Sequence, residues 1–80
     1  MNLRFALCNK QLKIVKILFY NINLERLGLS PNVLCFMPFK TKKINCVVAS
    51  GKVIVLENEV AEKVMVEYVW ILFNGKRQQR

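Results

Sequence analysis

The residue types that most often perform acid–base or metal chemistry are scarce in this sequence. It contains no histidine and no aspartate, so glutamate is its only acidic residue type. Histidine is the commonest general base and metal ligand, and aspartate supplies much of the chemistry of bound Mg²⁺. Four of the glutamates, Glu57, Glu59, Glu62 and Glu67, cluster in sequence, but Glu59, Glu62 and Lys63 have the spacing of a solvated helix face. We therefore expect a protein that is not an enzyme and that needs no metal and no cofactor.

Two further patterns of reactive residues are weak. Cys8, Cys35 and Cys46 are widely spaced and lack a Cys-x-x-Cys pair, so neither a zinc site nor a disulfide framework is indicated. A thiol nucleophile would also need a base that the sequence lacks. Ser50-Gly51-Lys52 shares a Gly-Lys pair with phosphate-binding loops, but the upstream glycine is missing, and a hairpin tip is the better interpretation. Free cysteines favour a reducing, intracellular compartment, with the cytoplasm as the expected location.

Positive charge is the strongest functional feature of the sequence. There are 13 Lys and Arg residues against 5 acidic ones, and the formal net charge is +8. Most of this charge lies in residues 1–43 and 75–80. Such a field attracts polyanions, whether nucleic acid or an acidic protein surface. The residues predicted to bind nucleic-acid phosphates are Lys10, Lys13, Lys16, Lys40, Lys42, Lys43, Lys52, Lys76, Arg77 and Arg80.

Apolar residues make up 54% of the chain, more than a core of 80 residues can easily hide. We therefore expect an exposed apolar patch that binds a protein partner or a second copy of the chain. If residues 59–74 form a helix, Val66, Trp70 and Phe73 make a separate apolar stripe on it, and these are the predicted protein-interface residues. No apolar run reaches the roughly 18 residues of a membrane span, so no integral span is expected.

Helical spacing dominates the first third of the chain. Leu12, Val15, Phe19 and Ile22 recur at steps of three and four residues, which predicts a helix over 10–27. Gly28 can end this helix in the left-handed conformation. A short apolar run follows at residues 33–37, and Pro38 should stop it as a strand or confine it to a sheet edge.

The second half of the chain begins with a clear hairpin pattern. Two β-rich runs separated by Ala49-Ser50-Gly51-Lys52 predict a hairpin over 44–56. Asn58 can then cap a helix over 59–74. Residues 64–73 are rich in β-branched and aromatic side chains, so a long strand remains the alternative there.

The predicted fold class is α+β, with a small antiparallel sheet built around the 44–56 hairpin and covered by one or two helices (10–27 and 59–74). Residues 1–75 are expected to form a single small domain and residues 76–80 a flexible basic tail. The charge favours a non-catalytic, RNA-binding type of nucleic acid-binding module within a ribonucleoprotein-like assembly. One alternative is a small phage- or viral-type adaptor or inhibitor that acts through a hydrophobic protein–protein interface. Another is a peripheral binder of anionic membranes that uses the 10–27 helix.

Overall fold

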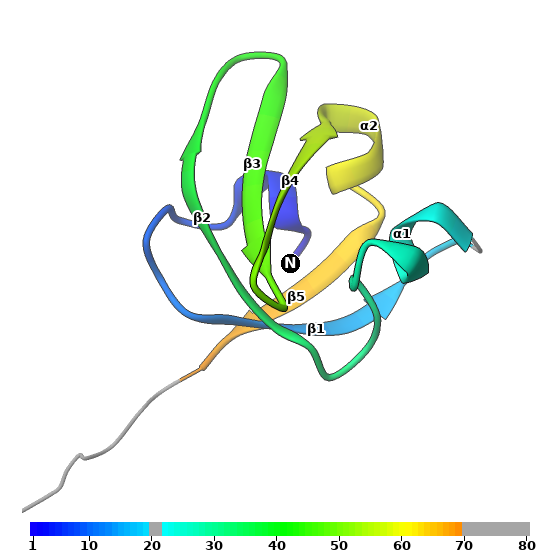
Figure 1. Ribbon diagram of the computed structural model, residues 1–80. Coiled ribbons are helices and arrows are strands. Elements are labelled where there is room, and N and C mark those ends of the chain that lie inside the picture. Colours follow the sequence, from blue (N-terminus) through cyan, green and yellow to red (C-terminus); the bar gives the residue numbers. More distant parts are fainter. Residues whose placement is uncertain (20–21, 70–80) are drawn as a thin grey trace, which may run out of the picture.

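The computed structural model describes residues 1–19 and 22–69, and its framework is a five-stranded antiparallel sheet (Figure 1). In chain order, the elements are η1 (Leu3–Phe5), β1 (Leu12–Ile17), α1 (Ile22–Arg26), β2 (Leu34–Lys40), β3 (Ile44–Ala49), β4 (Lys52–Glu57), α2 (Asn58–Ala61) and β5 (Val64–Tyr68). The strand order is β4-β3-β2-β1-β5, so the last strand in sequence pairs with the first. The fold is mostly β with very short helices, and the predicted α+β class is wrong.

The segment predicted as the first helix is mainly a strand. β1 pairs with both β2 and β5, and of the predicted helix 10–27 the structure shows only Ile22–Arg26 as helical. Gly28 does have a left-handed conformation, with a φ of 96°, but it follows this short helix instead of a long one.

A β-bulge interrupts the alternation of side chains in β1. Ile14 and Lys16 lie opposite adjacent residues of β5, so Val15 is an extra residue in the ladder. Because a bulge shifts the alternation of side chains by one residue, Ile14 and Ile17 both pack against the core. The helix prediction paired Leu12 with Val15, but Leu12 is buried and Val15, the bulge residue, is 46% exposed.

The predicted second helix, 59–74, is also wrong over most of its described length. Only Asn58–Ala61 is helical, and β5 then runs through Val64–Tyr68, as the alternative interpretation held. In a strand, alternate side chains point to the same side, so Val64 and Val66 enter the core. Since Val66 is only 3% exposed, it cannot belong to an exposed stripe. Trp70 and Phe73, the other members of the predicted stripe, lie outside the described residues.

β2 continues through Pro38 instead of stopping there. Its register against β3 shifts between Phe36 and Phe39, which leaves one extra residue in β2. At such a bulge the missing N–H of proline does not cost a ladder hydrogen bond, so the strand tolerates it.

The hairpin is the local structure that the sequence predicted correctly. β3 and β4 pair without interruption from Ile44 opposite Glu57 to Ala49 opposite Lys52. The residues between them, Ser50 and Gly51, have φ values of 53° and 74°. Two left-handed residues in a two-residue loop are typical of a type I′ turn, whose twist matches that of the flanking strands.

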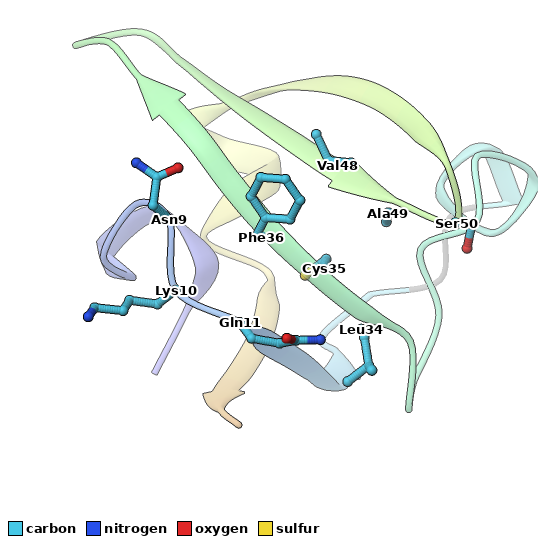
Figure 2. A pocket seen from close by; sticks show the side chains of 9 residues that line it. All are labelled: Asn9, Lys10, Gln11, Leu34, Cys35, Phe36, Val48, Ala49 and Ser50. Atoms are coloured by element: carbon cyan, nitrogen blue, oxygen red, sulfur yellow. The ribbon is translucent and has the colours of Figure 1, made fainter. Parts of the chain in front are cut away.

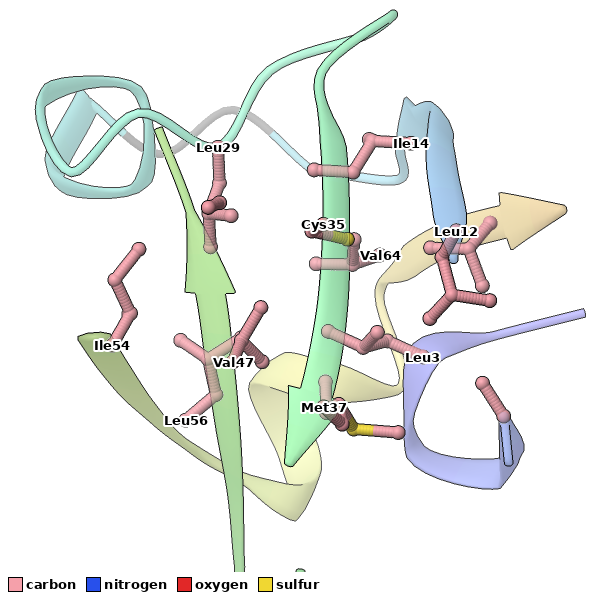
Figure 3. Close-up of a cluster of buried hydrophobic side chains, with 14 of the residues drawn as sticks. Leu3, Leu12, Ile14, Leu29, Cys35, Met37, Val47, Ile54, Leu56 and Val64 are labelled. Atoms are coloured by element: carbon pink, nitrogen blue, oxygen red, sulfur yellow. The ribbon is translucent and has the colours of Figure 1, made fainter. Parts of the chain in front are cut away.

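The core lies between one side of the sheet and the segments that cover it (Figure 3). All five strands contribute to it, and η1, α1 and α2 add Leu3, Leu24 and Ala61. The large apolar side chains with no exposed surface are Leu3, Leu12, Ile14, Leu29, Met37, Val47 and Val64. We call the opposite side of β2, β3 and β4 the outer face, and it is the surface considered next.

Candidate functional site

The lysines predicted to form one basic surface are distributed over the molecule. Lys10 precedes β1, and Lys13 and Lys16 lie in β1 itself, so the predicted helical row of lysines does not exist. Lys13 lies 3.8 Å from the carboxylate of Glu67 on β5. Three more of the predicted lysines are exposed, but at opposite ends of β3, with Lys42 and Lys43 in the turn before it and Lys52 after it. A six-residue strand spans about 20 Å, so these side chains do not converge.

Lys40 has a structural role in this fold. Its Nζ donates hydrogen bonds to the carbonyl oxygens of Arg4 at 2.8 Å and of Ala6 at 2.9 Å. These bonds tie β2 to the η1 segment, which also contributes buried side chains to the core.

A Lys40→Gln variant tests this role. Because hydrogen bonds from a charged donor are worth about 1.5–3 kcal/mol each, and these are partly exposed, we expect the free energy of unfolding to fall by about 1–2 kcal/mol. Urea denaturation followed by circular dichroism measures this loss. The matched control is Lys42→Gln, at an exposed position, and it should change the free energy of unfolding by less than about 0.5 kcal/mol. Equal losses of unfolding free energy from the two substitutions would show that the hydrogen bonds of Lys40 do not stabilise the fold.

The remaining predicted basic residues, Lys76, Arg77 and Arg80, lie outside the described part of the chain. The prediction that all ten basic residues bind phosphates therefore has no single surface to support it among residues 1–19 and 22–69.

The outer face of β2, β3 and β4 is apolar, and this is the feature that the sequence interpretation missed. The alternation of each strand and the register between strands place nine residues on it: Leu34, Phe36 and Phe39 of β2, Ile44, Cys46 and Val48 of β3, and Val53, Val55 and Glu57 of β4. Only Glu57 is charged. An antiparallel sheet with one side on the core usually presents polar side chains on the other. Here both sides of the same three strands are apolar.

Cross-strand pairing gathers these side chains into two rows. Phe36 lies opposite Val48, and Val48 lies opposite Val53 on the next strand. The second row joins Phe39, Cys46 and Val55 in the same way. Side chains directly opposite one another on neighbouring strands are in contact distance, so each row is continuous across the sheet.

Exposure separates the centre of the outer face from its margins. Cys46, in the middle strand between Phe39 and Val55, is only 4% exposed, whereas Phe39 is 53% and Val55 is 58% exposed. Contiguous exposed apolar surface of this kind marks sites of protein–protein contact in soluble proteins. The composition predicts exposed apolar surface, and part of it lies on this face, while Phe5, Leu7 and Leu18 are exposed elsewhere.

A shallow depression continues the outer face towards β1 (Figure 2). Its volume is about 450 Å³. Phe36 and Val48 form its apolar side on two neighbouring strands, and the loop residues Asn9, Lys10 and Gln11 form its polar side. The depression suits an apolar side chain of a partner whose polar or acidic neighbours meet Lys10.

The three cysteines are free thiols in different surroundings. Cys8, Cys35 and Cys46 are free thiols, and burial raises the pKa of Cys35 to about 11, so this thiol stays protonated at neutral pH. In the ranges 1–19 and 22–69, no group of three His, Cys, Asp or Glu side chains is placed to hold a metal ion. The same ranges contain no helix long and apolar enough to cross a membrane.

Comparison with solved structures identifies the architecture. A crystal structure of the iron uptake regulatory protein FeoA superposes with a TM-score of 0.80 at 18% sequence identity, covering 86% of this chain and 96% of the FeoA chain. This chain has the FeoA fold. A solution structure of iron(II) transport protein A from Clostridium thermocellum has a TM-score of 0.81 at 16% identity over 86% of this chain. A FeoA-like protein from Clostridium acetobutylicum has a TM-score of 0.76 at 13% identity, covering 88% of this chain and 87% of that one.

The extent of these matches differs between the FeoA-fold proteins. This chain covers only 46% of the Clostridium thermocellum protein, so it spans about half of that protein's length. No protein-family model matches the sequence, and no curated protein sequence matches it significantly. The likeness is therefore one of fold, a five-stranded SH3-like arrangement, at sequence identities of 13–18%.

These neighbours overturn the functional hypothesis drawn from the charge. All three are described as iron transport, iron uptake or FeoA-like proteins, and none as part of a nucleic-acid assembly or as a viral accessory protein. The prediction of an RNA-binding accessory module is wrong. A positive net charge attracts anions of every kind, and proteins of many different folds carry such a charge. The charge of this chain therefore does not indicate nucleic acid in particular.

Proposed function

We propose that this chain is an accessory module of ferrous iron uptake, which acts by binding a protein through its outer face and does not hold the iron itself. The observation that supports this most directly is the fold, because the FeoA chain is covered over 96% of its length by the elements described here. Iron(II) transport and iron uptake regulation are the functions named for two of the structural neighbours.

The residue types available as iron ligands support the proposal that the chain does not hold the iron itself. Ferrous iron is bound in proteins by imidazole and carboxylate groups or by several thiolates, and this sequence has no histidine and no aspartate. Of the two nearly buried cysteines, Cys35 lies in the core and Cys46 on the outer face, so the sheet separates their thiols. The outer face therefore suits protein docking better than these side chains suit metal binding. The lack of histidine and aspartate also supports the proposal that the chain is non-catalytic.

The outer face supports the protein-binding part. It combines exposed aromatic and β-branched side chains with a depression that can receive one apolar side chain, and aromatic residues are enriched where proteins bind one another. The lysines around it, Lys10 at the depression and Lys42, Lys43 and Lys52 at the two turns, favour a partner with acidic residues at the margin of its contact surface.

The experiment that tests the proposal is deletion of the gene in the cells that encode it. Uptake of radioactive Fe(II) under reducing conditions should fall several-fold, and re-expression of the chain should restore it. Uptake of Mn(II) serves as the control and should be unchanged. Full Fe(II) uptake in the deletion strain would contradict the role in iron uptake. Stoichiometric binding of Fe(II) to the purified chain in anaerobic calorimetry would contradict the claim that it does not hold the metal.

A further inference from the structure

A polar depression opens beside the N-terminal end of β3, on the side of the sheet opposite the outer face. Asn45 of β3 points to this side, because alternate residues of a strand face opposite ways and its neighbours Ile44 and Cys46 belong to the outer face. The depression has a volume of about 700 Å³. The polar residues that line it are Arg4, Lys40, Thr41, Lys42, Asn45 and Asn58. It is separate from the docking surface proposed above.

Asn45 brings a buried hydrogen-bond acceptor without a partner to this depression. Its side chain has no exposed surface, and its Oδ1 atom accepts no hydrogen bond from the residues that the structure describes. Its Nδ2 atom donates to the carbonyl oxygen of Leu56 at 3.2 Å and to Oδ1 of Asn58 at 3.0 Å. Asn58 in turn donates from Nδ2 to the carbonyl oxygen of Lys42 at 2.6 Å. Because backbone carbonyls can only accept, these bonds fix the orientation of both side-chain amides.

The same bonds direct Oδ1 of Asn45 towards the depression. Since Nδ2 points to β4 and α2, the oxygen on the other side of the planar amide faces away from them, towards Lys40, which lies opposite Asn45 on β2. Lys40 and Thr41 line the depression on that side. A buried acceptor without a donor destabilises a protein, and native proteins usually satisfy such a group. Oδ1 therefore indicates a site for a group that donates a hydrogen bond.

The other polar groups on that side of the depression are donors with capacity to spare. The ammonium group of Lys40 has three N–H groups, and its two bonds to backbone carbonyls leave one of them unused. Oγ1 of Thr41 accepts hydrogen bonds from the amides of Lys43 and Ile44, so its own O–H is left to donate. Lys42 is exposed, and its side chain forms no hydrogen bond with the described residues. A ligand here meets several donors and one acceptor.

The charges around the depression indicate an anion. Arg4 is paired with Glu62. Lys40 and Lys42, in contrast, have no carboxylate partner within residues 1–19 and 22–69. Two positive side chains without a partner suit a ligand with a double negative charge, whose oxygens accept hydrogen bonds from them. The unpartnered oxygen of Asn45 requires that this anion also carry a proton to donate.

From these observations we infer that the depression binds a small dianion that carries one hydroxyl group, either hydrogen phosphate or a hydroxydicarboxylate. The anionic oxygens accept hydrogen bonds from Lys40, Thr41 and Lys42, and the hydroxyl group donates to Oδ1 of Asn45. Because Oδ1 is buried, binding requires side chains at the mouth of the depression to move outward, and the exposed side chain of Lys42 is free to do so. This inference goes beyond the proposed function and does not depend on iron.

Titration of the full chain with two matched pairs of anions, followed by NMR spectroscopy, tests the inference. At about pH 8, phosphate and sulfate are both dianions, but only phosphate carries a proton. Malate and succinate differ only by the hydroxyl group of malate. Phosphate, malate or both should bind saturably with a dissociation constant of about 1–10 mM, and about tenfold or more tightly than the matched anion without a hydroxyl group. The side-chain amide resonances of Asn45 and Asn58 should shift.

The two pairs also distinguish the two sources of the ligand. Saturable binding of phosphate alone assigns the site to phosphate, and saturable binding of malate alone assigns it to hydroxydicarboxylates. Equal affinities within both pairs overturn the inference, because charge alone would then account for binding. Absence of saturable binding up to about 50 mM of either anion also overturns it. So do shifts that leave the side-chain amide of Asn45 unchanged.

Variants separate the contribution of charge from that of the buried acceptor. Lys42→Gln should weaken binding about threefold or more, whereas the matched control Lys52→Gln, an exposed lysine at the other end of β3, should change it less than about twofold. Equal effects of the two changes overturn the assignment to this depression. Asn45→Ala should abolish the preference for the anion with a hydroxyl group, and a preference that persists overturns the role of Oδ1. If Asn45→Ala prevents folding, the anion pairs on the unaltered chain still decide.

Discussion

A chain in which Phe36 and Phe39 are both replaced by serine is expected to fold but to lose its contribution to ferrous iron uptake. Both side chains project from β2 on the outer face, where they are 39% and 53% exposed. Because their surface is only partly buried, the free energy of unfolding should fall by about 1–2 kcal/mol, far less than for a fully buried aromatic residue. Docking, in contrast, loses two aromatic anchors, and loss of one such residue commonly costs 2 kcal/mol or more of binding energy. Fe(II) uptake by cells expressing this variant should therefore match the deletion strain.

The matched control for this variant is replacement of Phe5 and Leu7 by serine. These side chains are 64% and 58% exposed, and they belong to the N-terminal segment and not to the outer face. This control removes a similar amount of exposed apolar surface and should support near-normal uptake. Full uptake with the Phe36 and Phe39 variant, or equal loss with both, would show that the outer face is not the docking surface. Circular dichroism on the purified variants verifies that each is folded.

Replacing Leu12 by alanine is expected to unfold much of the protein at physiological temperature. Leu12 has no exposed surface, and in β1 it lies opposite Cys35 of β2 and Tyr68 of β5, where the two halves of the sheet meet. A buried Leu→Ala change costs about 2–5 kcal/mol. A domain of this size has little more stability than that to lose.

Val15→Ala in the same strand is the control for Leu12→Ala. Val15 is the bulge residue and is 46% exposed, so its truncation should cost less than about 1 kcal/mol in urea denaturation. A helix over 10–27 would instead place both residues on its buried side, and both changes would then be costly. Equal losses from Leu12→Ala and Val15→Ala would contradict the strand.

Interactions close in sequence were the ones that could be predicted correctly. The hairpin follows from two alternating β-rich runs and from Ser50-Gly51, which can adopt the two left-handed conformations of a tight turn. Gly28 was expected in a left-handed conformation after a helix, and it has one. In each case the residues that decide the structure are neighbours in the chain.

The first and last strands could not be predicted in this way. β1 and β5 are separated by most of the described chain, and each is a strand because the other supplies hydrogen-bonding partners along its edge. Within β1 the three-residue step from Leu12 to Val15 suggested a helix although Val15 is exposed, and Val64–Tyr68 has apolar residues that fit a helix face as well as a strand. A segment whose pattern fits both a helix and a strand becomes a strand when a distant strand supplies its hydrogen-bonding partners.

The outer face could not be predicted from the sequence for a related reason. Phe36, Val48 and Val53 come from three strands, and only the register between those strands shows that they form one row. The composition indicated that the core could not contain all the apolar side chains, but the stripe proposed for them depended on a helix, and one of its members, Val66, is buried.

By itself, the sequence determined the chemistry that this protein has available: a strongly basic chain without histidine or aspartate, with more apolar side chains than its core can hold, and with one hairpin coded locally. Tertiary structure alone decided that β1 and β5 are strands, that the lysines are dispersed and that part of the apolar excess gathers on one side of β2, β3 and β4. The physical reason is that side-chain types are fixed residue by residue, whereas the direction in which each side chain points depends on hydrogen-bonded partners far away in the chain.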